Sequence, residues 1–140
     1  MNRTTGLAAL ICLPVLAAAA SADGAGQRVE IDGRIFDAAE IAAGEAVFER
    51  RCSQCHGLDG RNYKGPFLNG ILDRPAASVP DWDYSEALRG WGGVWTVGNL
   101  QSWLTRPEAF IPGIAMNFGG FRNRTEDRDR VIAYLISLGR

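Results

Sequence analysis

The residues with the clearest chemistry lie in one five-residue segment, Cys52-Ser53-Gln54-Cys55-His56. Two thiols three positions apart can reach the two vinyl groups on one edge of a porphyrin, and the adjacent imidazole then comes beneath the iron. This spacing is typical of a c-type haem attachment site. The segment therefore predicts one covalent haem c, bound through Cys52 and Cys55, with His56 as a ligand of the iron.

Two other chemistries are compatible with a close pair of thiols. A redox dithiol has a depressed thiol pKa, but it does not need the neighbouring histidine. A zinc site needs four ligands, and after residue 22 the chain has only two Cys and one His, so carboxylates would have to supply the rest. Haem is favoured, and both alternatives stay open at this point.

The scarcity of suitable side chains indicates the second axial ligand. His56 is the only histidine, and Met116 is the only methionine besides Met1. A thioether opposite an imidazole raises the reduction potential of a haem iron. Met116 could instead fill a gap in the core, but its place between Pro112-Gly113 and Gly119-Gly120 indicates a loop and favours the ligand.

The elements that must position these groups are helical. Asp37 and Glu40 form a capping box, and an apolar face from Ile41 to Phe48 predicts a helix that leads into Cys52. Residues 57–83 are rich in Gly, Pro, Asn and Asp and predict a loop. Such a loop is long for a compact domain, and it makes sense if it wraps something other than protein.

Three more helical segments are predicted. Residues 85–89 form a short turn of helix, and residues 98–106 form a helix that the following proline ends. Residues 108–124 are expected to be irregular. Thr125 is expected to cap a last helix, which runs nearly to the end of the chain.

The first 22 residues have the layout of a secretory signal peptide. Arg3 gives a positive start, residues 6–20 are apolar, and Ala20-Ser21-Ala22 is a small-residue cleavage site. The apolar run of about 15 residues is short of the roughly 20 that a membrane helix needs, so cleavage is favoured over an uncleaved anchor. The mature chain is expected to be periplasmic, with no integral membrane segment.

The charge of the chain gives no reason to expect nucleic acid as a partner. Removal of Arg3 leaves 14 basic side chains against 16 acidic ones, a net charge of −2. Four cationic side chains flank the attachment segment: Arg50, Arg51, Arg61 and Lys64. They form either a locally positive docking patch or scattered, solvated charge.

From about Gly44 to Leu138 the sequence resembles the class I cytochromes c, of the mitochondrial and small bacterial soluble type. The matching pieces, in chain order, are Gly44 to Phe48, the Cys-x-x-Cys-His segment, Gly65 to Gly70, Phe110 to Met116 with Phe118 and Gly119, and Val131 to Leu135. The resemblance implies an all-α fold in which three to five helices surround one covalently attached haem and the first and last helices cross.

The resemblance also implies roles for further residues. In the family, the residue that matches Pro66 accepts a hydrogen bond from the proximal imidazole through its backbone carbonyl. The residues expected around the haem propionates are Arg74, Tyr84, Ser85 and Trp95. The residues expected where the first and last helices cross are Gly44, Phe48, Val131 and Tyr134.

Three residues depart from the family pattern and make the expected pocket less polar. Trp103 stands where a tyrosine near the methionine sulfur is usual, Leu88 replaces an asparagine, and Ile114 replaces a threonine. A less polar pocket disfavours the extra positive charge of ferric iron, so we expect a raised reduction potential. The lysine ring of the family is also missing, so partner recognition does not carry over.

The sequence predicts an electron carrier rather than an enzyme. It would pass single electrons between a donor dehydrogenase and an acceptor oxidase or other cytochrome, either free or as a subunit of such a complex. The alternative is a ligand-binding or peroxidase-type haem protein with a labile Met116. That function usually needs a distal acid–base group, and no second histidine exists to provide it.

Residues 23–36 form an N-terminal arm ahead of the domain at 37–140. Asp32-Gly33, between two β-prone runs, is a strong signal for a hairpin, although an isolated hairpin is marginally stable in water. The arm lies outside the family resemblance and is not needed to hold haem. We therefore hypothesise that the arm docks on a redox partner.

Overall fold

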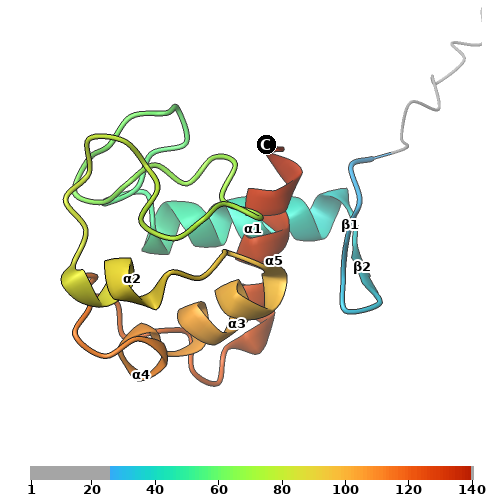
Figure 1. The fold of residues 1–140 in the computed structure, drawn as a ribbon. Helices are drawn as coiled ribbons and strands as arrows, with labels where there is room; N and C mark the ends of the chain where they lie inside the picture. The colour runs from blue at the N-terminus through green and yellow to red at the C-terminus, as the bar shows by residue number, and fades with distance from the viewer. Residues whose placement is uncertain (1–25, 140) are drawn as a thin grey trace, which may run out of the picture.

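The structure is a computed structural model that describes residues 26–139, so the predicted signal peptide lies outside the described residues. Within them, a hairpin is followed by helices joined by long loops (Figure 1). The elements are β1 (Val29–Ile31), β2 (Arg34–Phe36), α1 (Ala38–Arg51), α2 (Glu86–Trp91), α3 (Val97–Thr105), α4 (Pro107–Phe110) and α5 (Thr125–Ser137). No helix of this part of the chain has the length and apolar character that a membrane span requires.

Helix α1 begins directly after the predicted cap, Asp37, and ends immediately before Cys52. The Asp37 carboxylate accepts a hydrogen bond from the Glu40 N–H at 2.9 Å, which satisfies one of the free donors of the first turn. Ile41, Val47 and Phe48 bury the apolar face of the helix. The predicted cap and helix are therefore confirmed.

Helices α1 and α5 cross closely, as the resemblance implies (Figure 1). A Cβ atom on Gly44 would lie 2.0 Å from the carbonyl oxygen of Arg130, so only glycine permits this approach. The rings of Phe48 and Tyr134 pack beside it, with centroids 5.9 Å apart. The crossing brings together the two ends of the domain and places the start of the haem-attachment segment beside the core.

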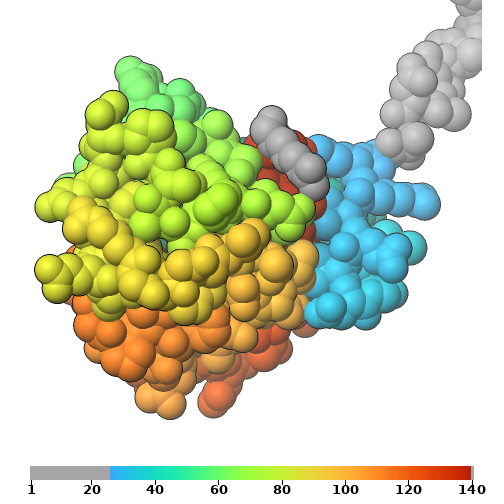
Figure 2. Space-filling view, in the orientation of Figure 1, coloured from blue at the N-terminus to red at the C-terminus, as the bar shows by residue number. Residues whose placement is uncertain are grey.

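The predicted hairpin is confirmed, and it adds a small sheet to the helical fold. Asp32 and Gly33 both have positive φ, 50° and 80°, as a two-residue turn matched to the strand twist requires. Val29, Ile31 and Phe36 are buried in the common core, and Arg34 bonds to Glu40 and Glu126. The described part of the arm therefore lies against α1 and α5 (Figures 1 and 2). This packing stabilises a hairpin that would be only marginally stable on its own.

The segment after α3 differs from the expected irregular loop. Arg106 is extended, with φ −157° and ψ 88°, as a residue before proline prefers, and Pro107 then begins the short helix α4. Proline suits a first helical position because its missing N–H has no partner there in any case. The proline that ends one helix thus also starts another.

The prediction that Thr125 caps the last helix is wrong. Arg124 holds the cap position without a side-chain hydrogen bond, and Thr125 is already helical. The reason lies in the preceding turn, where the Arg124 N–H donates to the Phe121 carbonyl at 2.9 Å and the Arg128 N–H donates to the Arg124 carbonyl at 3.2 Å. The helix therefore starts one residue earlier than a threonine cap would allow.

Candidate functional site

One cavity of about 360 Å³ lies between the end of α1, the long loop before α2, helix α3 and the loop that carries Met116. Its lining includes all ten residues that the sequence assigned to cofactor binding: Cys52, Cys55, His56, Pro66, Arg74, Tyr84, Ser85, Trp95, Trp103 and Met116. Cys52 and Met116, which are 64 positions apart in the sequence, therefore line the same cavity.

The imidazole of His56 is held in one orientation. Its Nδ1 lies 2.7 Å from the Pro66 carbonyl oxygen, and a Cβ on Gly65 would come within 2.5 Å of its Cε1. Burial lowers the pKa of His56, which keeps the ring neutral at pH 7. A neutral ring that donates its Nδ1 proton to Pro66 leaves the Nε2 lone pair for a metal ion.

No disulfide joins the two cysteines, and Cys52 is half-buried whereas Cys55 is exposed. Burial raises the pKa of Cys52 to about 11, the opposite of the depressed pKa that a reactive dithiol requires. Within residues 26–139 no group of three or more His, Cys, Asp and Glu side chains could hold a metal ion. The raised pKa of the Cys52 thiol thus disfavours the dithiol, and the lack of such a group among the described residues disfavours zinc.

Met116 lies partly buried in the loop between α4 and α5 rather than on a helix face. The loop is attached to the fold on both sides of this residue. Before it, the Gly113 N–H donates to the Glu108 carboxylate at 3.0 Å. After it, Gly120 lies against the end of α3, where a Cβ would be 2.1 Å from the Thr105 carbonyl oxygen. These attachments present the thioether to the cavity.

Arg74 is a fixed, half-buried cation in the cavity wall. Its guanidinium donates to the carbonyl oxygens of Phe67 at 2.9 Å and Asn69 at 3.2 Å, and it lies 5.2 Å from the centroid of the Phe67 ring. Burial lowers the pKa of Arg74, although a guanidinium stays charged at neutral pH. This cation suits an anionic group on a ligand.

Three further polar groups of the cavity wall can donate a hydrogen bond to a ligand. The Tyr84 hydroxyl accepts from the Val79 N–H at 3.3 Å, and the Ser85 hydroxyl caps α2 by accepting from the Leu88 N–H at 3.3 Å. Each hydroxyl keeps its own proton for a further bond. Trp95 is 7% exposed and carries an indole N–H that can likewise donate to a ligand.

The remaining lining is largely apolar, and sequence analysis left part of it unassigned. Leu88, Trp103 and Ile114, the three departures from the family pattern, all line the cavity. Residues that were not assigned to the site include Trp82, Leu68, Ile71, Leu100, Leu104 and Leu135. Trp82 stands between two aspartates in a polar loop. A large aromatic ring isolated in such a loop was the sequence signal that could have identified Trp82 as a residue of the site.

These groups fit a haem c better than any other ligand that the sequence allows. Two thiols, a neutral imidazole and a thioether match the attachment and axial positions, and the guanidinium of Arg74 with nearby hydroxyl and indole donors matches two propionates. The apolar lining matches a porphyrin ring. The fold and this set of side chains together define a c-type haem protein.

The comparisons with known proteins agree with this class. Residues 41–139 match the model of the family described as Cytochrome c, so the chain belongs to the cytochrome c family. It is 44% identical over 102 residues to cytochrome c2 of Agrobacterium tumefaciens, covering 69% of this chain and 90% of the relative. It is 40% identical over 112 residues to the cytochrome c-type cyt cy of Rhodobacter capsulatus, covering 80% of this chain and 55% of the relative.

A solved structure shows the same fold. Cytochrome cH from Methylobacterium extorquens superposes with a TM-score of 0.65 at 34% sequence identity, covering 69% of this chain and 97% of the other. The protein is therefore a monohaem c-type cytochrome and an electron carrier, with one covalently bound haem c. Haem supplies a metal ion that changes its charge by one without a bond being made or broken.

Proposed function

We propose that this protein carries single electrons between redox proteins of the periplasm, and that His56 and Met116 are the residues that would hold the haem iron. One observation carries the proposal: the imidazole of His56, oriented by Pro66, and the thioether of Met116 line the same cavity. Two such ligands would keep the coordination of the iron similar in both oxidation states, which would keep the reorganisation on electron transfer small. They would also leave no open position for a substrate.

The chain's own residues have three tasks in this function. Pro66 and Gly65 hold the His56 ring in place, and the anchored loop holds Met116. Arg74 neutralises negative charge inside the cavity. The apolar lining excludes water, which would otherwise stabilise the more highly charged iron.

The proposal is tested on the purified protein by absorption spectroscopy and a redox titration. We expect a thioether-to-ferric charge-transfer band, a single one-electron transition and slow binding of cyanide. A high-spin ferric spectrum with rapid binding of cyanide or carbon monoxide would contradict it and support a ligand-binding or peroxidase-type protein.

Export is tested by a separate experiment. If the signal peptide is cleaved after Ala22, mass spectrometry of the mature protein should find its N-terminus at Asp23.

Redox partners are proposed to dock on a cationic surface beside the cavity. Arg61 does not belong to this surface, because it pairs with Asp59 at 2.6 Å. Arg51 and Lys64 line the cavity itself and form no ion pair within the described residues. Because Arg51 also lies 5.6 Å from the centroid of the Phe118 ring, this positive charge extends toward the Met116 loop.

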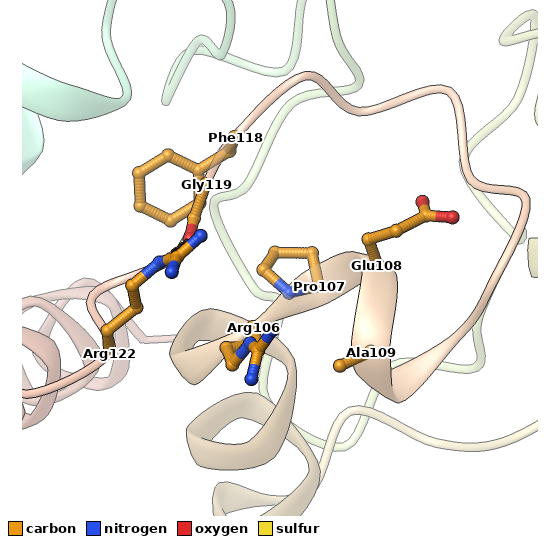
Figure 3. A pocket seen from close by; sticks show the side chains of 7 residues that line it. All are labelled: Arg106, Pro107, Glu108, Ala109, Phe118, Gly119 and Arg122. Carbon is orange, nitrogen blue, oxygen red and sulfur yellow. Dashed lines mark hydrogen bonds between the residues drawn. The ribbon is translucent and has the colours of Figure 1, made fainter.

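A second pocket, of about 320 Å³, lies between α4 and the loop residues Phe118 to Arg122 (Figure 3). Arg106 and Arg122 line it together with Glu108, and Phe118 borders both this pocket and the main cavity. We define the cationic surface as Arg51 and Lys64 in the wall of the main cavity with Arg106 and Arg122 in the wall of this pocket. This arrangement suits a partner with an acidic face.

Charge reversal on the cationic surface should slow electron exchange with anions. For Lys64→Glu combined with Arg122→Glu, we expect oxidation by ferricyanide at low salt to slow by about tenfold and its dependence on ionic strength to weaken or invert. Oxidation by a cationic cobalt(III) complex should become faster. The control is Arg28→Glu, a charge reversal beside the hairpin at a residue that lines neither pocket, compared with Lys64→Glu alone, and an equal effect of the two would show that only net charge matters.

The less polar pocket gives a prediction for the reduction potential. Leu88→Asn adds a polar side chain that can stabilise ferric iron, so we expect the potential to fall by about 20–60 mV, the equivalent of roughly 0.5–1.4 kcal/mol for one electron. Cyclic voltammetry measures this value. Leu88→Ile is the matched control, and an equal shift there would assign the change to packing rather than polarity.

The outer face of the hairpin is proposed to contact a redox partner. Ile35 is 56% exposed there, whereas Val29, Ile31 and Phe36 belong to the core. Deletion of the arm would therefore destabilise the domain as well as remove the contact, and Ile35→Ser separates the two effects. We expect at least about a fivefold loss in co-purification of the native complex, without a change in thermal stability beyond about 0.5 kcal/mol. Unchanged co-purification would leave the arm with a packing role only.

A further inference from the structure

Three of the four tryptophans form a continuous chain that leads from the cofactor cavity toward α4. Trp103 and Trp95 line the cavity, and their ring centroids are 5.2 Å apart. Trp95 and Trp91 follow at 5.0 Å. Trp91 does not line the cavity; it ends α2 and is partly exposed, with the ring of Phe110 in α4 at 5.4 Å.

The position of the Trp91 ring depends on a glycine. A Cβ on Gly93 would come within 2.5–2.7 Å of three atoms of the Trp91 indole, so any other residue there would displace the ring. Trp95 and Trp103 are each only 7% exposed. Two rings are therefore fixed by burial, and the third is fixed against a glycine backbone at the surface.

Indole is among the most easily oxidised side chains, and rings in van der Waals contact exchange electrons rapidly. Packing explains buried aromatic pairs in general. It does not by itself require that the third ring, which is partly exposed, be an easily oxidised indole. A chain of oxidisable rings from cofactor to surface is a path along which an electron vacancy can move.

We propose that Trp91, Trp95 and Trp103 form an electron outlet from the reduced haem to a strong one-electron oxidant at the surface of α2. The oxidant takes one electron from the Trp91 indole, which becomes a radical cation. Trp95 and then Trp103 each pass one electron outward in turn, and ferrous iron becomes ferric. One oxidant is reduced for each iron oxidised, all three indoles are restored, and no proton is consumed. The route rests on the bound haem and not on which partner docks at the cationic surface.

The test places a photo-oxidant beside Trp91 in the holoprotein. Gly90 is exposed in α2, and a Cβ there meets nothing within 4 Å, so Gly90→His offers a surface imidazole for a ruthenium bipyridine label. His56 is the only native histidine and is proposed to be held by the iron, so the label has one site. Flash photolysis with a quencher then generates ruthenium(III), and the oxidation of ferrous haem is followed by absorption.

Trp91→Phe in the labelled protein should slow the oxidation of the haem by about tenfold or more, because phenylalanine raises the barrier to the first step. Trp91→Tyr, which restores an oxidisable ring, should recover most of the rate. In a second protein, labelled through Lys64→His on the cavity rim, Trp91→Phe should change nothing. A transient indole-radical absorption should accompany the fast phase.

An unchanged rate in Trp91→Phe would overturn the proposal, and so would a Trp91→Tyr variant as slow as Trp91→Phe. The haem spectrum and reduction potential of each variant show whether the cofactor site is intact. A negative result in this experiment would not contradict the carrier function, because the reversible one-electron transition of the haem is measured without the label.

Discussion

Replacement of Met116 by alanine is expected to open the sixth position of the iron. The variant should lose the thioether-to-ferric charge-transfer band and bind cyanide and carbon monoxide rapidly. Its reduction potential should fall by on the order of 0.2 V, a fraction of the roughly 0.8 V range that axial ligands span. The physical reason is that a thioether favours ferrous iron, whereas the water that replaces it favours ferric iron.

Ile114→Ala provides the matched control for this result. Ile114 lines the same cavity from the same loop, but it has no atom that can ligate iron. Its truncation should leave the band and the ligand reactivity unchanged, with only a modest loss of stability. If Met116→Ala kept the native spectrum, another group would have to be the sixth ligand, and the carrier mechanism would need a different basis.

The second large effect is expected at the crossing of α1 and α5. A Cβ on Gly44 would lie 2.0 Å from the Arg130 carbonyl oxygen and 3.0 Å from the Tyr134 Cβ, so Gly44→Ala must force two helix backbones apart. We expect a loss of about 3 kcal/mol or more in the free energy of unfolding, at or above the upper end of the range for overpacked sites. Guanidinium unfolding followed by far-UV circular dichroism measures it.

A glycine in open space supplies the control for this substitution. Gly98 lies in α3, and a Cβ there meets nothing within 4 Å. Gly98→Ala should therefore leave the stability unchanged or raise it by up to about 0.5 kcal/mol, because alanine loses less backbone entropy than glycine and Gly98 lies in the first turn of the helix, where this preference is weaker than in the interior. Equal destabilisation by both substitutions would show that the close crossing is not the cause.

Local signals predicted much of the fold correctly. The Asp37 cap, the apolar face of α1 and the Asp32-Gly33 turn depend on residues a few positions apart, and each is confirmed. Local signals failed at Thr125, because the turn before α5 is closed by backbone bonds from Phe121 onward. A capping preference of about 1 kcal/mol does not override such a turn.

The sequence did not predict which charged side chains form ion pairs. Arg50, Arg51, Arg61 and Lys64 look alike as neighbours of the attachment segment, yet Arg61 is paired with Asp59. Arg106 and Arg122 are distant in sequence but share a pocket beside Phe118. Which cations remain unpaired depends on the conformation of the loops, and no periodic pattern encodes it.

The sequence by itself determined the cofactor, the attachment residues and the candidate axial ligands. It could do so because the spacing of Cys52, Cys55 and His56 is set by covalent geometry, and because the chain contains so few histidines and methionines. Only the tertiary structure decided that the hairpin belongs to the core and that Trp103, Trp95 and Trp91 form one chain of rings. Those features arise where separate segments pack together, and the resulting distances follow from the three-dimensional fold rather than from any local pattern.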